Sequence, residues 1–310
     1  MRPILLTFLL VGFSNFLFAQ VTSSPLTLER PELVLHGTLE GPTQASDSVL
    51  VIIIQGSGPT DRDGNNPMAK NNSLQMLSTA LVEKGYFTFR YDKRGIGESI
   101  LPPEEMPNLV FEDFVKDVVA WKEYLEKTYH FNKIFIAGHS QGSLVAGLAH
   151  LQSPAAGIIS LAGTARSADV LIVDQLGKQN EKLASDAKSY FATLAQGDSL
   201  GEINPFLNSL FNPAILPFLQ SYVAYNPSEV YQQIKVPVLV VTGAADLQVP
   251  VPDGEALDQI SENSELAVIP TMNHVLKSVS SEQENYLSYG NPDLPLHEAL
   301  IPIIDAFLQQ

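Results

Sequence analysis

The chain has 310 residues, 45% of them hydrophobic, which is enough for one large core or for one core with an insertion. Its formal net charge of −16 argues against nucleic-acid binding, because an acidic chain does not attract a phosphate backbone. Cysteine is absent, which excludes disulfide bonds, a thiolate metal site and a cysteine nucleophile.

The first 20 residues, MRPILLTFLLVGFSNFLFAQ, have the pattern of a secretory signal peptide. A positive charge at Arg2 precedes an apolar stretch, and the small residue Ala19 ends it. The polar pair Ser14–Asn15 leaves the apolar run short for a membrane span of about 20 residues. We therefore expect residues 1–19 to be removed and residues 20–310 to be exported to the periplasm or outside the cell, with no stable membrane anchor.

Strand and helix patterns alternate along most of the chain. The expected strands cover 32–40, 49–55, 86–91, 133–138, 156–162, 236–242 and 266–269. The expected helices cover 73–84, 111–130, 140–150 and 296–308. This alternation predicts an α/β fold, with a mostly parallel central sheet flanked by helices on both faces.

From about Thr164 to Glu229 the rhythm changes to helical patterns without a convincing strand. We interpret this segment as a helical insertion into a single domain of residues 20–310. Its aromatic and leucine side chains are expected to pack mainly between the insertion and the sheet. Some of them are expected to line an apolar acyl pocket.

The stretch IFIAGHSQGSLVAGLAH joins an expected strand to an expected helix through GHSQG, residues 138–142. A serine on a sharp strand-to-helix turn projects away from the backbone, and the flanking glycines let the chain turn sharply. Ligands bind beyond the carboxyl ends of such strands. Gly-x-Ser-x-Gly alone is a weak pattern, and the alternative is an ordinary turn with a capping serine. The strand before it and the helix after it favour Ser140 as a nucleophile.

A serine hydroxyl needs a base to attack at neutral pH. The chain has six histidines, at positions 36, 130, 139, 150, 274 and 297. His274, in IPTMNHVLK, follows the expected strand 266–269 and so lies at the same sheet edge as Ser140. His139 is held within the turn itself, and the others lie in or beside expected elements. His274 is therefore the candidate base, and an ordinary loop histidine is the alternative.

The base needs an acid to orient it. In VVTGAADLQVP, Asp246 lies four residues after Thr242, at the end of the preceding expected strand. Asp253 is the nearest competitor, but it lies further from the strand end. Either carboxylate could instead be a solvated loop residue or a helix cap. The spacing favours Asp246.

A tetrahedral intermediate needs two backbone N–H donors to stabilise its oxyanion. The N–H of Gln141 is the first candidate, because it follows the nucleophile and opens a helix. The second should come from QGSGPTDRDGNN, the loop after the expected strand 49–55. Ser57 N–H is the first choice there and Gly58 N–H the alternative, although GSGP could also be a simple turn.

Taken together, these motifs resemble the α/β-hydrolases of the serine esterase and peptidase type. The matching stretches are QGSGP, RYDKRGIGES, GHSQG, GAADLQVP and MNH, in family order from residue 55 to 274. The resemblance implies the α/β-hydrolase fold with a helical cap formed by the insertion. The order serine, acid, histidine carries the catalytic roles over to Ser140, Asp246 and His274.

Two further positions follow from the same resemblance. Arg94 and Glu98 in RYDKRGIGES are interpreted as organising their loop, not as catalytic residues. Gln55 departs from many relatives, which have histidine before the oxyanion glycine. Since that histidine is not a catalytic base, the departure leaves the oxyanion hole little affected.

Serine at the turn argues against dehalogenases and epoxide hydrolases of this fold, which carry aspartate there. Hydrolysis at a carbonyl remains, with no metal or cofactor needed. We expect a carboxylesterase that acts on a small-molecule acyl ester. An acyl thioesterase comes second, an aminopeptidase third, and acyl transfer is an option if the site excludes water. A non-catalytic binding protein is least expected because all three catalytic residues are present. The sequence gives no indication of the oligomeric state.

Overall fold

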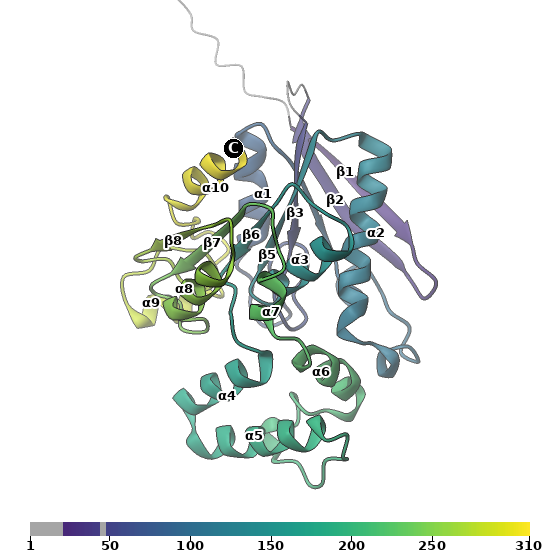
Figure 1. Cartoon of the computed structure of the whole chain (residues 1–310), viewed down its shortest axis with the longest axis vertical. Coiled ribbons are helices and arrows are strands. Elements are labelled where there is room, and N and C mark those ends of the chain that lie inside the picture. The colour runs from purple at the N-terminus through teal and green to yellow at the C-terminus, as the bar shows by residue number, and fades with distance from the viewer. Residues whose placement is uncertain (1–20, 44–47) are drawn as a thin grey trace, which may run out of the picture.

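The computed structural model describes residues 21–43 and 48–310, so the expected signal peptide lies outside the described residues. The described chain forms one eight-stranded sheet with the order β1-β2-β4-β3-β5-β6-β7-β8 (Figure 1). The strands are β1 (Val21–Glu29), β2 (Val34–Pro42), β3 (Val49–Ile54), β4 (Phe87–Tyr91), β5 (Lys133–His139), β6 (Gly157–Leu161), β7 (Val238–Gly243) and β8 (Ser264–Ile269).

The sheet is mostly parallel, as predicted. Pairing is parallel from β4 through β3, β5, β6 and β7 to β8. It is antiparallel between β1 and β2 and between β2 and β4. The sequence did not predict β1, because most of its side chains are exposed and only Leu26 and Leu28 alternate with polar residues. This edge strand forms through its register with β2, from Val21 opposite Pro42 to Glu29 opposite Val34.

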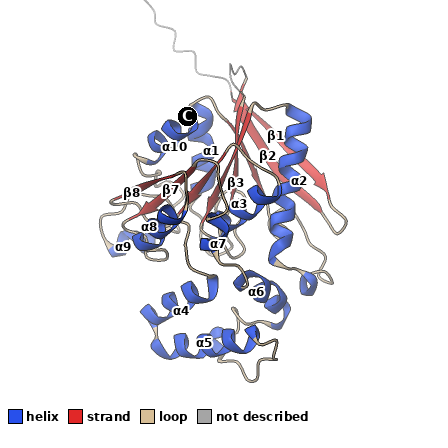
Figure 2. Ribbon diagram, viewed as in Figure 1, coloured by secondary structure: helices blue, strands red, loops and turns tan. Residues whose placement is uncertain are grey.

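The helices lie on both sides of the sheet (Figure 2). The helices of the main body are α1 (Ser73–Glu83), α2 (Phe111–Tyr129), α3 (Gln141–Gln152), α8 (Val251–Ile260), α9 (Glu282–Ser288) and α10 (Leu300–Leu308). Short 3-10 helices cover Met106–Asn108, Pro205–Leu207 and Pro213–Ile215. The sequence patterns did not predict α8 and α9. Across the described residues, no helix is both long and apolar enough to cross a bilayer.

The continuous apolar run of β3 is explained by burial on both faces. Leu50, Ile52 and Ile54 belong to a core cluster with side chains of α2 and α3. The alternate residues of the strand, such as Val51 and Ile53, belong to a second cluster with side chains of α1 and α10. Because successive strand residues point to opposite faces, a strand buried twice carries no polar alternation.

Between β6 and β7 the chain leaves the sheet and forms α4 (Ala168–Gln179), α5 (Glu181–Ala195), α6 (Leu216–Val223) and α7 (Pro227–Tyr231). Helices α4, α5 and α6 lie together on one side of the main body (Figure 1). Apolar side chains of this insertion form their own cluster around Phe191, Phe211 and Leu219. Phe111 of α2 stacks on Tyr222 of α6, with ring centroids 4.6 Å apart, which ties the insertion to the main body.

Candidate active site

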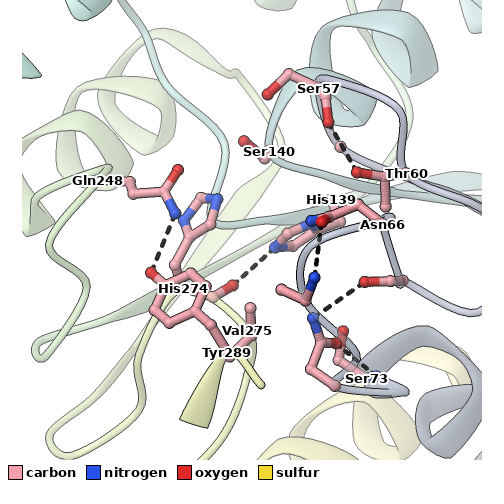
Figure 3. A pocket seen from close by; sticks show the side chains of 14 residues that line it. Ser57, Thr60, Asn66, Ser73, His139, Ser140, Gln248, His274, Val275 and Tyr289 are labelled. Atoms are coloured by element: carbon pink, nitrogen blue, oxygen red, sulfur yellow. Dashed lines mark hydrogen bonds between the residues drawn. The ribbon is translucent and has the colours of Figure 1, made fainter. Parts of the chain in front are cut away.

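Ser140 lies where β5 ends and α3 begins, with φ 54° and ψ −119° (Figure 3). Positive φ is uncommon for a residue with a side chain and persists only where its surroundings fix it. Here the backbone N–H of Ser140 donates to Leu161 O of β6 at 2.8 Å, and Ser140 O accepts from Ser143 N at 2.9 Å. The turn is therefore held from both sides, and the side chain of Ser140 lines a cavity.

Close backbone contacts explain the two glycines of GHSQG. A Cβ atom at Gly138 would lie 2.1 Å from the carbonyl oxygen of Gly142. A Cβ atom at Gly142 would lie 2.6 Å from the carbonyl oxygen of Ile54 in β3. Both distances are shorter than any tolerable contact, so the tight passage from β5 to α3 requires glycine at both positions.

His274 and Asp246 are paired within the protein. His274 Nδ1 lies 2.8 Å from Asp246 Oδ2, and both residues are buried. Asp246 Oδ1 accepts hydrogen bonds from the backbone N–H groups of Gln248 at 2.7 Å and Val249 at 2.9 Å. Burial acts to raise the pKa of Asp246, but His274 and these donors outweigh it, and the net effect is a lowered pKa. An ionised Asp246 fixes a proton on Nδ1 and leaves Nε2 of His274 to exchange protons.

The competing carboxylate, Asp253, has a different partner. Its two oxygens accept from Arg166 Nε at 2.9 Å and Arg166 Nη2 at 2.7 Å, and Thr164 Oγ1 donates to it at 2.7 Å. This bidentate pair fastens the start of the insertion to α8. The geometry therefore brings Asp246 to His274 and uses Asp253 to attach the insertion.

His139 supports the loop that carries His274. Its Nε2 lies 2.7 Å from the backbone oxygen of His274, and the two rings have centroids 4.9 Å apart. Burial, followed by the nearby His274, lowers the pKa of His139 to about 4. His139 is therefore uncharged at neutral pH and donates to the His274 carbonyl.

The two expected oxyanion donors come from different elements. Gln141 N–H opens α3, and Ser57 N–H lies in the loop after β3. In the described parts of the chain, neither N–H donates to a backbone carbonyl. Thr60 Oγ1 donates to Ser57 O at 2.8 Å and so fixes the far side of Ser57. Gly58, with φ 70°, stays the alternative donor.

A cavity of about 170 Å³ opens beside Ser140 and His274 (Figure 3). Its side chains are largely polar and come from the loop after β3 and from the opposite wall. The polar side chains that were not expected from the sequence are Thr60, Asn66, Asn71, Ser73, Gln248 and Tyr289. The signal for Asn66, Asn71 and Ser73 was the asparagine-rich run GNNPMAKNNS, which overlaps the end of the oxyanion loop.

The loop after β3 is fixed by polar side chains. Asn65 Oδ1 accepts from the backbone N–H groups of Asn71 and Asn72, both at 2.9 Å. Arg62 donates to Asp92 Oδ2 and Glu98 Oε2, each at 2.6 Å, and so ties this loop to RYDKRGIGES. These bonds place the polar wall of the cavity, and Glu98 organises its loop as interpreted from the sequence.

The cavity of about 170 Å³ does not test the expected apolar acyl pocket under the insertion, which stays a prediction. Among the described residues that line the 170 Å³ cavity, none belongs to residues 164–229. Apolar side chains of the insertion pack on each other and on α2. A second cavity, of about 610 Å³, does involve the insertion. It is lined by Gln175, Lys178 and Gln179 of α4 and by Leu247, Gln248, Glu282, Tyr286 and Tyr289.

Gln248 and Tyr289 line both cavities. Gln248 Nε2 donates to the Tyr289 hydroxyl at 3.0 Å, and Gln175 Nε2 of the insertion donates to Gln248 O at 3.1 Å. This chain of hydrogen bonds forms the boundary between the two cavities. Among the described residues, no three or more histidine, aspartate or glutamate side chains lie close enough together to hold a metal ion.

In sequence comparison, residues 70–196 match the model of the family described as serine aminopeptidase, S33. The chain is 25% identical over 265 residues to the esterase EstD of Thermotoga maritima, an alignment that covers 84% of this chain and 62% of EstD. The chain thus spans less than two thirds of the length of that relative.

Structural comparison gives the same fold. Est1E of Butyrivibrio proteoclasticus, whose structure contains bound ferulic acid, has a TM-score of 0.59 and 19% identity, covering 92% of this chain and 98% of Est1E. The esterase PF2001 of Pyrococcus furiosus has a TM-score of 0.58 and 17% identity, covering 93% of this chain and 90% of the esterase. The predicted resemblance to α/β-hydrolases and the predicted fold are confirmed.

Proposed function

We propose that the chain, which has the α/β-hydrolase fold and resembles serine hydrolases in its motifs, cleaves carboxylic esters through an acyl-serine intermediate. The observation that carries the proposal is the position of Ser140 on a strained turn beside His274, whose Nδ1 is 2.8 Å from buried Asp246. The esterase name of the Thermotoga maritima relative supports ester substrates.

In the proposed reaction, Ser140 is the nucleophile, His274 transfers protons, and Asp246 stabilises the charged form of His274. Ser140 Oγ attacks the ester carbonyl while His274 Nε2 takes its proton. The N–H groups of Gln141 and Ser57 stabilise the oxyanion, and Asp246 stabilises the imidazolium. His274 then protonates the leaving alcohol, and the ester bond breaks to give acyl-Ser140. Water activated by His274 attacks this intermediate, releases the carboxylic acid and restores Ser140.

The cavities support a short acyl group and a larger alcohol. The cavity beside Ser140, at about 170 Å³, is small and largely polar in its side chains, which suits acetyl or another short acyl group better than a fatty acyl chain. The leaving alcohol takes its proton from His274, so it departs on the side of the Asp246–His274 pair. There the 610 Å³ cavity adjoins through Gln248 and Tyr289 and offers tyrosine rings and amide groups.

Aminopeptidase activity ranks below ester hydrolysis. An aminopeptidase must hold a substrate ammonium group, and buried cations of this kind are paired with carboxylates. The described residues that line the cavity at Ser140 include no aspartate or glutamate. A polar cavity without a negative charge favours a neutral acyl ester. Export of residues 20–310 belongs to the same proposal, which makes the substrate an extracytoplasmic ester.

The first test is labelling by a fluorophosphonate, which reacts with activated serines. We expect one adduct, on Ser140, located by mass spectrometry of peptides, together with hydrolysis of p-nitrophenyl acetate. Ser140→Ala should abolish both. Ser143→Ala is a matched control, because Ser143 lies on the same helix but binds the hydroxyls of Ser160 and Tyr231 at 2.7 Å. Full esterase activity in a folded Ser140→Ala protein would refute the proposal.

A further inference from the structure

Lys93, in the loop after β4, is a buried cation that the proposed mechanism does not use. Only 4% of it is exposed, and its Nζ donates to the carbonyl oxygen of Gly56 at 2.6 Å. The ring of Phe114 lies 5.6 Å from Nζ. Burial lowers the pKa of Lys93 to about 7. A lysine is seldom buried this deeply, and burial of its charge needs strong compensating contacts.

The neighbours of Lys93 have carboxylate or guanidinium partners, and Lys93 does not. Asp92 pairs with Arg62 at 2.6 Å, and Arg94 forms a bidentate pair with Asp117 at 2.7 and 2.8 Å. Within residues 21–43 and 48–310, no carboxylate lies within ion-pair distance of Lys93. Its hydrogen bond is directed at one backbone carbonyl only.

That carbonyl belongs to the peptide unit that supplies the oxyanion donor. The carbonyl of Gly56 and the N–H of Ser57 are the two ends of one planar peptide, and no cis peptide occurs in the described chain. In a trans peptide the C=O and N–H point in opposite directions. A contact that fixes Gly56 O therefore also fixes the direction of Ser57 N–H.

The peptide has little freedom on its other side. A Cβ atom at Gly56 would lie 3.1 Å from His139 Nδ1 and 3.3 Å from Ser140 Cβ, so the loop passes directly against the nucleophile turn. A rotation of the Gly56–Ser57 peptide would therefore change the donor geometry at the place where Ser140 reacts. Small misplacements of such groups have large effects on rate.

We propose that Lys93 is a positioning residue for the oxyanion hole, which aims and polarises the Ser57 N–H through the carbonyl of Gly56. A hydrogen bond from Nζ to the carbonyl oxygen withdraws electron density from the amide and makes its N–H a stronger donor, most strongly when Nζ carries its extra proton. In a buried site this effect is larger than in water. The inference rests on the proposed function, because it assumes that an oxyanion forms at Ser140.

The inference predicts a selective kinetic effect. Negative charge develops on the carbonyl oxygen of the ester mainly in the transition state, so Lys93 should affect kcat far more than KM. Loss of an entire oxyanion donor lowers kcat on the order of 10²–10³-fold. Because Lys93 acts through a peptide that stays in place, we expect Lys93→Met to lower kcat about 10- to 100-fold. Inhibition by a trifluoromethyl ketone should weaken by the same factor.

A matched control is available in Lys122. This lysine is also buried, at 2% exposure, but its Nζ binds Glu126 at 2.8 Å and Ser153 at 3.3 Å on α2 and beside α3. Lys122→Met also removes a buried ammonium group, and we expect it to change the free energy of unfolding without changing kcat. Circular dichroism of both variants reports whether they are folded.

The absence of cysteine allows a chemical rescue at one position. Lys93→Cys can be alkylated in denaturant with 2-bromoethylamine, which rebuilds a lysine-like ammonium, or with 1-bromopropane, which gives a neutral chain of equal length. After refolding, we expect the aminoethylated protein to recover most of kcat and the propylated protein to keep the defect.

These experiments distinguish failure of the proposed role of Lys93 from failure of the proposed esterase function. Normal kcat in folded Lys93→Met, equal loss in Lys122→Met, or equal kcat in the two alkylated proteins would each overturn the role of Lys93. If no uncharged variant folds, Lys93 serves the stability of the core alone, and this result would also overturn its positioning role. Wild-type protein that hydrolyses no ester and takes no fluorophosphonate would instead reject the proposed function.

Discussion

His139 donates a hydrogen bond from Nε2 to the backbone oxygen of His274 at 2.7 Å, so the residue before the proposed nucleophile holds the residue proposed as its base. Both the neutral and the protonated imidazole can donate this bond, and burial of His139 favours the neutral form. The loop that carries His274 is thereby tied to the turn that carries Ser140 through the side chain of His139. The burial of His139, rather than this contact, makes the fold sensitive to acid.

We expect the free energy of unfolding to fall between pH 6.5 and pH 4. The pKa of His139 is lowered from an ordinary 6.5 to about 4, so the folded state favours the uncharged form. Its contribution to stability is complete above pH 6.5 and is lost as the pH falls toward 4. The loss amounts to about 3 kcal/mol. His139→Gln supplies an N–H donor that cannot be protonated further. In urea unfolding, the free energy of unfolding of this variant should therefore change less with pH over this range. An equally steep profile in both proteins would count against the assignment.

Loss of either Ser140 or His274 should lower kcat about as much as loss of both. Ser140→Ala and His274→Ala should each lower kcat on the order of 10⁴–10⁶-fold, because either change leaves the others without a function. Steady-state rates with p-nitrophenyl acetate measure the loss, and circular dichroism checks the fold. A double variant should be no slower than either single one. Additive losses in the double variant would mean that the two residues act independently.

Asp246→Asn should retain more activity than either alanine variant. The amide keeps the size of the carboxylate but places an NH₂ or a neutral oxygen against His274 Nδ1, so the useful tautomer is lost while Ser140 and the oxyanion donors remain. We expect a loss on the order of 10²–10⁴-fold in kcat. Asp253→Asn is the matched control, since it weakens the Arg166 contact and should leave kcat near the wild-type value. A larger loss for Asp253→Asn would identify it as the acid.

Gly142→Ala should damage both the fold and the catalysis. The new Cβ atom would lie 2.6 Å from Ile54 O, and the clash is with backbone that cannot move alone. Thermal unfolding should show a lower midpoint, and kcat should fall because the turn at Ser140 shifts. Gly177→Ala, in α4, is the control, because its Cβ would lie 3.8 Å from Ala184 Cβ, and alanine stabilises a helix by about 1 kcal/mol over glycine. Wild-type stability in Gly142→Ala would contradict the close contact.

Local patterns were enough to predict most of the sheet and the motifs that meet at its edge. The buried run VLVIII and the turn GHSQG carry their structure in neighbouring residues, so the positions of β3 and Ser140 could be predicted. Strand β1 could not, because its stability comes from pairing with β2 and not from its own composition.

The residues of the cavity wall and the partners of the charged side chains could not be predicted from the sequence for a related reason. Asn66 and Tyr289 lie more than 200 residues apart and meet only through the fold. Lys93 stands between Asp92 and Arg94 in the sequence, yet they have ionic partners and it has a backbone carbonyl. Which of three adjacent charges is unpaired depends on the direction of each side chain, and a motif does not contain that information.

The small cavity at Ser140 predicts a limit on acyl length that one substitution should tighten. Ala69 lines this cavity and is half-buried. Ala69→Leu adds three carbon atoms to the wall, so we expect a several-fold loss of kcat/KM for p-nitrophenyl butyrate relative to the acetate. The neighbouring side chain of Met68 is 95% exposed, so Met68→Leu is a control that should leave the ratio unchanged. In wild-type protein, octanoate should be a poorer substrate than acetate. If octanoate is preferred, or if Ala69→Leu changes both short esters equally, the acyl group binds elsewhere than in the polar cavity.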